Sequence, residues 1–184
     1  TGYSQLGYMW ECPDYFEIEG KGILLFCPQG LGPKGDNYQN IYQSGYLLGE
    51  KLDVEDRTMQ HGEFVELDNG FDFYAPQTMQ APDGRRLLVG WMGLPEIAYP
   101  TDRNNWAHCL TIPRELTIKE NRIYQQPVRE LKKLRKKSVT IESTLSNQSK
   151  EFEGISGIAY ELECDFTMLT ASIAGVKLRT GREE

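Results

Sequence analysis

The sequence has little of what a metal site, a disulfide framework or a membrane span requires. Its 184 residues contain four cysteines, two histidines and no Cys-x-x-Cys pair. The residues concerned are Cys12, Cys27, Cys109, Cys164, His61 and His108. Such scattered thiols argue against a zinc site and favour a reducing, cytoplasmic location. No apolar run approaches the ~20 residues of a membrane helix, and the first residues show no basic-then-apolar leader pattern.

Basic charge is also in deficit, with 20 Lys and Arg against 27 Asp and Glu and a formal net charge of -7. This balance argues against a nucleic-acid partner, because such binding depends on neutralising phosphates. It suits a soluble protein whose partner is a small molecule or a sugar. The chain opens at Thr1 instead of Met and ends without a closing element. We therefore expect an internal piece of a longer protein.

Short strand-like runs dominate the chain as far as residue 128. The run GILLF at 22–26 is typical of a strand covered on both faces. The other expected strands are 64–67, 71–79, 87–92, 110–118 and 122–128. Turn sequences separate them, so the pattern predicts an all-β antiparallel meander. The pattern alone leaves a propeller, a sandwich and a barrel open.

Three turn sequences predict which strands pair with each other. The sequence DNG at 68–70 predicts a hairpin between the strands on either side of it. The sequence PDG at 82–84 predicts the next turn, and EN at 120–121 predicts the last.

The character of the sequence changes near Pro127. Residues 128–137 predict a short helix, whose basic side chains are better explained as a solvated linker than as a nucleic-acid surface. Apolar residues then alternate with polar ones over 158–166, which predicts a strand with one buried face. We therefore expect a new β domain of sandwich type to begin near Ser138.

The segment MWECPD at 9–14 is the first candidate for chemistry. Pro13 fixes the backbone just after Glu11 and Cys12 and removes a ladder donor. Burial beside Trp10 and Cys12 would favour the neutral, proton-donating form of the Glu11 carboxyl, as a general acid requires. Composition alone favours the structural alternative, an edge-strand glutamate beside a core tryptophan.

Aromatic residues lie beside carboxylates in the second and third clusters, 68–77 and 90–116. Rings can stack on the apolar faces of a sugar, and carboxylates accept hydrogen bonds from its hydroxyls. Taken singly, each aromatic residue fits a packed core better.

Together, four blocks resemble glycoside hydrolase family 32, and they occur in that family's order. The blocks are WECPD at 10–14, DFYAPQ at 72–77, GWM at 90–92 and WAHCLTIPREL at 106–116. Any one of them would be a weak match, whereas the number and order make the resemblance specific. It covers about residues 9–118, and the remainder is only compatible with the family's second domain.

The resemblance implies a five-bladed β-propeller followed by a β-sandwich. Residues 1–128 would be the C-terminal blades, 129–137 a helical linker and 138–184 the start of the sandwich. The implied reaction is retaining hydrolysis by two carboxylates, releasing the fructosyl unit of sucrose 6-phosphate, sucrose or a related fructoside, with no cofactor or metal.

Five positions acquire roles through the resemblance. Glu11 falls on the acid/base position, and Cys12 would shape its surroundings. Asp72, Tyr74 and Trp91 would line the substrate pocket. The resemblance singles out no phosphate-binding residue; Arg85, Arg86, Arg103 and Arg114 are available, and the last of these fits a structural role better.

Two of the family's motifs are missing: the WMNDPNG-type motif that carries the nucleophile and the RDP motif. Both precede the acid/base motif in the family, so we expect truncation, an inactive isolated chain, and self-association through exposed strand edges. Two alternatives remain open: a carbohydrate-binding or structural module that has lost its chemistry, and a partner-binding domain using the basic segment 129–137.

Overall fold

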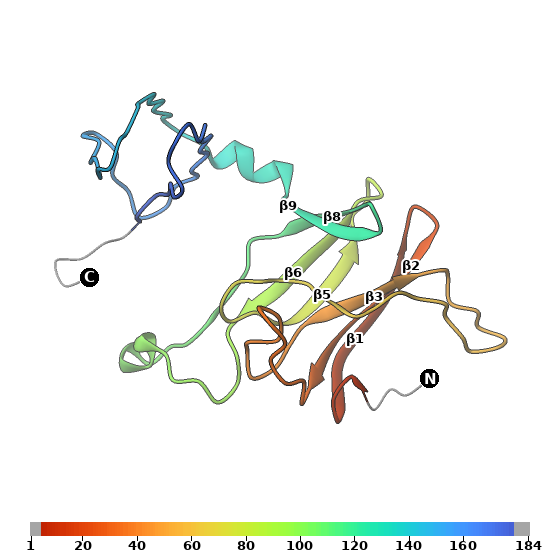
Figure 1. The fold of residues 1–184 in the computed structure, drawn as a ribbon. Helices are drawn as coiled ribbons and strands as arrows, with labels where there is room; N and C mark the ends of the chain where they lie inside the picture. Colours follow the sequence, from red (N-terminus) through yellow and green to blue (C-terminus); the bar gives the residue numbers. More distant parts are fainter. Residues whose placement is uncertain (1–4, 179–184) are drawn as a thin grey trace. The chain divides into compact units, whose positions relative to one another are not determined.

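The computed structural model describes residues 5–178 and divides into two compact units, residues 1–129 and 130–184. The regular structure of the first unit is almost entirely β, arranged as two antiparallel sheets (Figure 1). The all-β prediction is therefore confirmed for this unit.

The first sheet has the strand order β1-β2-β3-β4, with every neighbouring pair antiparallel. Its strands are β1 (Met9–Ile18), β2 (Lys21–Gln29), β3 (Gly45–Gly49) and β4 (Val65–Glu66). Strand β2 is the best covered, because Ile23, Leu25 and Phe26 have no exposed surface. This confirms the prediction of a strand buried on both faces at 22–26.

The second sheet has the order β5-β6-β8-β9, with β7 paired to the far end of β6. Its strands are β5 (Tyr74–Gln80), β6 (Arg86–Met92), β7 (Cys109–Leu110), β8 (Arg114–Lys119) and β9 (Arg122–Pro127). The turns predicted at 82–84 and 120–121 join β5 to β6 and β8 to β9. Glu120 and Asn121 both have positive φ, the backbone of a tight hairpin turn that matches strand twist.

The hairpin predicted at 68–70 is wrong. Strand β4 pairs with β3 in the first sheet, whereas β5 pairs with β6 in the second. The turn chemistry itself is present, since the Asp68 carboxylate accepts a hydrogen bond from the Gly70 amide at 2.8 Å. The same carboxylate also pairs with Arg114 of the second sheet at 2.7 Å. The segment is thus a crossing between sheets.

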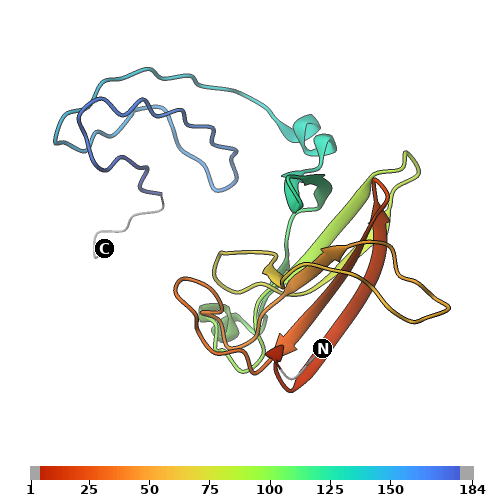
Figure 2. The ribbon, with the colours of Figure 1, turned by 45° about the vertical axis from the view of Figure 1, so that its right-hand side comes forward.

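The core lies between the two sheets, which face each other in both views (Figures 1 and 2). Its buried members are Phe16, Ile23, Leu25, Tyr46, Leu48, Leu67, Phe73, Leu88 and Leu116. Complete burial of one such aliphatic side chain stabilises a fold by about 1.5–3 kcal/mol. The core thus packs the first sheet against the second, and β1 and β5, which carry Glu11 and Tyr74, lie next to each other.

The second unit departs from two predictions. The helix expected over 128–137 is limited to the 3₁₀ helix η3 (Arg129–Leu134). The strand expected over 158–166 is absent: these residues adopt no regular structure, and Ile158 is 88% exposed. Alternation alone does not hold a strand, and residues 135–178 supply no partner strand for it.

Candidate active site

Glu11 lies on β1 with its carboxylate held from two other strands. Its Oε2 accepts hydrogen bonds from the Tyr74 hydroxyl at 2.8 Å and from Nε2 of Gln29 at 3.0 Å. Its Oε1 accepts none from the described residues, 5–178. One oxygen is thus fixed by the protein, while the other remains available for proton exchange.

The same backbone feature, a β-bulge, follows Glu11 on β1 and Tyr74 on β5. Glu11 and Tyr74 are each followed by a residue with positive φ, Cys12 at 50° and Ala75 at 48°. A proline comes next on each strand, and the pairing register then shifts by one residue, forming a β-bulge. Bulges redirect side chains and are frequent beside active sites. Here, the two bulged strands bring together the groups that precede their bulges.

Burial fixes the protonation state of Tyr74. The side chain is only 3% exposed, and burial raises the pKa of its hydroxyl well above the usual range. The hydroxyl therefore keeps its proton at neutral pH and acts as a donor to Glu11.

Two thiols lie beside this pair. Cys27 is the residue opposite Glu11 across β1 and β2, and its Sγ lies 3.3 Å from the Ser44 hydroxyl. Burial raises the pKa of Cys27 to about 11, and burial followed by the Glu11 charge raises that of Cys12. Both groups are therefore neutral thiols near pH 7, the weakly nucleophilic form of cysteine.

A series of aromatic contacts extends from Tyr74. Trp91 meets Tyr74 edge-on at 6.4 Å between ring centroids, and His108 packs on Trp91 at 4.8 Å. Tyr99 meets His108 edge-on at 4.4 Å. At the end of the series, the Tyr99 hydroxyl donates to Oδ2 of Asp72 at 2.6 Å. Half-buried rings beside carboxylates are suited to a sugar.

The five residues assigned through the resemblance therefore fall in one region. Glu11, Cys12, Tyr74 and Trp91 belong to a single packed group. Asp72 joins them indirectly, through Tyr99 and His108.

Sequence reasoning missed three members of this group. Gln29 is 8% exposed and bonds to both Glu11 and Tyr74. A polar residue ending an otherwise apolar strand was the available signal for Gln29. His108 lies in the block at 106–116, but no role was assigned to it. Tyr99 had no signal, because the 94–108 segment has little regular structure and its contacts depend on the fold.

The other charged residues near the site have structural partners. Asp14 accepts hydrogen bonds from the backbone amide and hydroxyl of Thr78, at 2.8 and 2.5 Å, and pairs with Arg86 at 3.4 Å. Arg114 bonds to Asp68 and to Gln125, which confirms the structural interpretation of that arginine.

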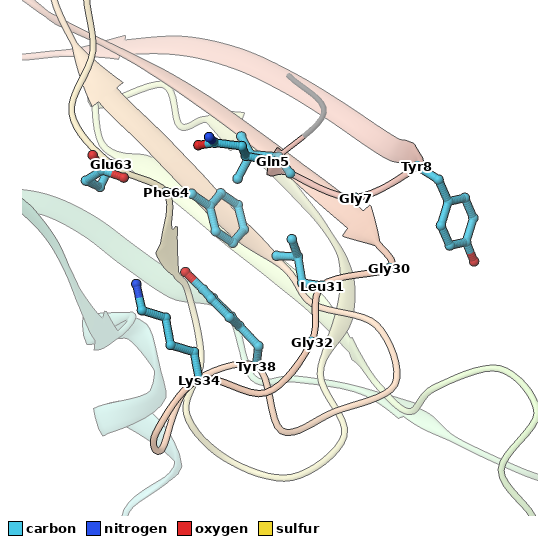
Figure 3. A pocket seen from close by; sticks show the side chains of 11 residues that line it. Gln5, Gly7, Tyr8, Gly30, Leu31, Gly32, Lys34, Tyr38, Glu63 and Phe64 are labelled. Carbon is cyan, nitrogen blue, oxygen red and sulfur yellow. The ribbon is translucent and has the colours of Figure 1, made fainter. Parts of the chain in front are cut away.

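Hollows elsewhere on the unit do not include the predicted residues. One of about 560 Å³ lies where the 30–38 loop meets Phe64, and another of about 370 Å³ lies over Trp10 and Leu47. Figure 3 shows Leu31, Tyr38 and Phe64 gathered at the first. Both hollows are lined by residues of the cluster that contains Trp10, whereas Glu11 bonds to Gln29 and Tyr74 outside that cluster.

Residues 5–178 lack the features of a membrane-spanning helix and of a metal-binding cluster. No helix there is long and apolar enough to cross a membrane. No group of three or more His, Cys, Asp or Glu side chains in this part of the chain could hold a metal ion.

Residues 1–127 match the N-terminal domain of glycosyl hydrolases family 32, and the chain belongs to this family. Among curated proteins, it is 46% identical to the sucrose-6-phosphate hydrolase of Staphylococcus xylosus, over 100% of this chain and 37% of that protein. The Bacillus subtilis sucrose-6-phosphate hydrolase is 47% identical over 81% of this chain and 32% of its own length. The chain thus spans about a third of these relatives.

Solved structures agree with this assignment. The Bombyx mori family 32 beta-fructofuranosidase matches with a TM-score of 0.71 and 46% identity, covering 75% of this chain and 30% of that one. Sucrose-6-phosphate hydrolase from Lactobacillus gasseri matches with a TM-score of 0.68 and 40% identity, covering 73% and 28%.

Proposed function

We propose that this chain is part of a longer enzyme, here called the parent enzyme, that releases the fructosyl unit of sucrose 6-phosphate or sucrose with retention. The main support is the geometry of the Glu11 carboxylate. Tyr74 and Gln29 donate hydrogen bonds to one of its oxygens, and the other oxygen is available to a substrate. Two curated relatives named sucrose-6-phosphate hydrolase support the substrate class. A variant of the related Bombyx mori enzyme was solved in complex with sucrose.

In the proposed mechanism, Glu11 is the acid/base. It protonates the glycosidic oxygen as the bond to the fructosyl carbon breaks, while a carboxylate outside this chain forms the covalent intermediate. Glu11 then takes a proton from the water that releases fructose. Retaining enzymes generally hold the two carboxyl groups about 5–5.5 Å apart. A five-bladed propeller with a C-terminal sandwich is the proposed architecture of the parent enzyme.

The first test compares the parent enzyme with the isolated chain. We expect the parent enzyme to release fructose from sucrose 6-phosphate and sucrose. The isolated 184 residues should release none, because a proton donor without a nucleophile forms no covalent intermediate. Enzymatic fructose determination provides the measurement, with circular dichroism to check folding. An inactive parent enzyme overturns the proposed reaction, and activity of the purified chain overturns the assignment of a missing nucleophile.

Arg103 is the proposed contact for the 6-phosphate group. The other three candidate arginines already pair with carboxylates: Arg85 with Asp83, Arg86 with Asp14 and Arg114 with Asp68. Arg103 is exposed in the 3₁₀ helix η2 (Pro100–Asn104) and forms no ion pair within residues 5–178.

We expect Arg103→Ala in the parent enzyme to lower kcat/KM for sucrose 6-phosphate about tenfold, the effect of losing a charge-assisted hydrogen bond. Activity on unphosphorylated sucrose should stay within about twofold. Arg122→Ala, at an exposed arginine of β9, is the matched control. Equal losses on both substrates would remove the phosphate assignment.

A further inference from the structure

Tyr99 holds the carboxylate of Asp72 in place through its hydroxyl group. Its hydroxyl accepts a hydrogen bond from the Leu94 amide at 3.0 Å and donates to Oδ2 of Asp72 at 2.6 Å. With both roles used, the hydroxyl has a fixed orientation. Its ring packs edge-on against His108, which in turn packs on Trp91.

Asp72 lies in a segment without regular structure, so its carboxylate depends on side-chain contacts for a fixed position. It belongs to the irregular crossing between the two sheets, before β5 begins. The backbone on either side is held, since the Phe71 carbonyl accepts from Asn40 at 3.1 Å and the Phe73 carbonyl accepts from the Ser44 hydroxyl at 3.4 Å. Neither bond orients the Asp72 carboxylate. Within residues 5–178, the Asp72 carboxylate accepts its hydrogen bond from Tyr99 on Oδ2, and Oδ1 accepts none. An oxygen held open in this way can accept from a sugar hydroxyl.

We infer that Tyr99 is a positioning residue that holds the Asp72 carboxylate beside the Trp91–His108 rings, where it accepts hydrogen bonds from the hydroxyls of the sugar substrate. This role rests on the proposed function. Tyr99 itself touches no reacting atom, so its loss weakens substrate binding and leaves the chemical step alone. Burial and the Asp72 charge raise the pKa of the Tyr99 hydroxyl, so it remains a donor at neutral pH.

The test is Tyr99→Phe in the parent enzyme, which removes the hydroxyl and keeps the ring. We expect KM for sucrose to rise about tenfold with kcat within about twofold, the pattern of lost uniform binding. Tyr15→Phe is the matched control: its hydroxyl also accepts from a backbone amide, that of Leu52 at 2.9 Å, and donates to a carboxylate, that of Glu17 at 3.3 Å. Tyr15 lies away from the site, so this variant should keep the wild-type KM.

A double-mutant cycle distinguishes an effect of Tyr99 through Asp72 from a general loss of order in the site. If Tyr99 acts through Asp72, Tyr99→Phe should have little further effect in an Asp72→Ala background. Full additivity, an unchanged KM or an equal fall in kcat would each overturn the inference. Titration of sucrose into Glu11→Gln, with and without Tyr99→Phe, measures binding without turnover. If the wild-type enzyme hydrolyses neither sugar, the proposed function fails, while a Tyr99-dependent change in binding still supports the positioning role and an unchanged affinity overturns it.

Discussion

Replacing Glu11 by glutamine should slow fructose release by the parent enzyme by a factor of roughly 10²–10⁴, the usual contribution of general acid–base assistance. The amide has nearly the same shape and can still accept the hydrogen bond from the Tyr74 hydroxyl. It cannot deliver a proton to the departing oxygen. The measurement is kcat/KM on sucrose and on sucrose 6-phosphate.

Two comparisons sharpen this result. Glu17→Gln is the matched control, because Glu17 is on the same strand and has an exposed ion pair with Lys51. It should retain full activity. An aryl fructoside with a good leaving group depends less on protonation, so its first step should be slowed less by Glu11→Gln. Wild-type rates for Glu11→Gln on sucrose would show that the acid/base lies elsewhere.

The second large effect concerns stability. Asp14→Ala should lower the free energy of unfolding of the β domain by about 3 kcal/mol, since removing one partner of a largely buried ion pair leaves the other unpaired. The side chains of Asp14 and Arg86 are only 13% and 18% exposed. The change also removes both acceptor contacts to Thr78, so β1 and β5 lose a direct connection.

Urea unfolding of the parent enzyme, followed by tryptophan fluorescence, measures this loss. The matched control is Asp83→Ala: the Asp83 side chain is 40% exposed, and Arg85 keeps its second carboxylate partner, Glu115, after the change. Such surface pairs are worth about 0–1 kcal/mol. A similar, small change for both variants would mean that the Asp14 contacts do not hold the sheets together.

Local chemistry accounts for the parts of the fold that the sequence predicts. The β8–β9 hairpin follows from two adjacent turn residues, and β2 follows from a short apolar run. The 68–70 segment shows the limit of such reasoning. Its turn exists, but the partners of the strands on either side are decided by which faces enter the core. The alternation at 158–166 fails similarly, since a strand requires a neighbour.

The site shows the same division. Glu11, Tyr74 and Trp91 could be located because they lie within recognisable blocks of sequence. Their contacts could not, since Tyr74 is 63 positions from Glu11 and Tyr99 is 27 from Asp72. Residues far apart in the sequence come into contact only when the chain has folded, so no local sequence pattern predicts such contacts.

The paired bulges on β1 and β5 limit how such a chain can vary. A slip of one residue reverses which face a strand's side chains occupy. Inserting or deleting one residue at 11–14 would therefore turn the acid away from its partner, and the same change at 74–77 would turn Tyr74 away from Glu11. We expect these two stretches to keep their length among proteins that share the site, whereas insertions and deletions should fall in the connecting loops.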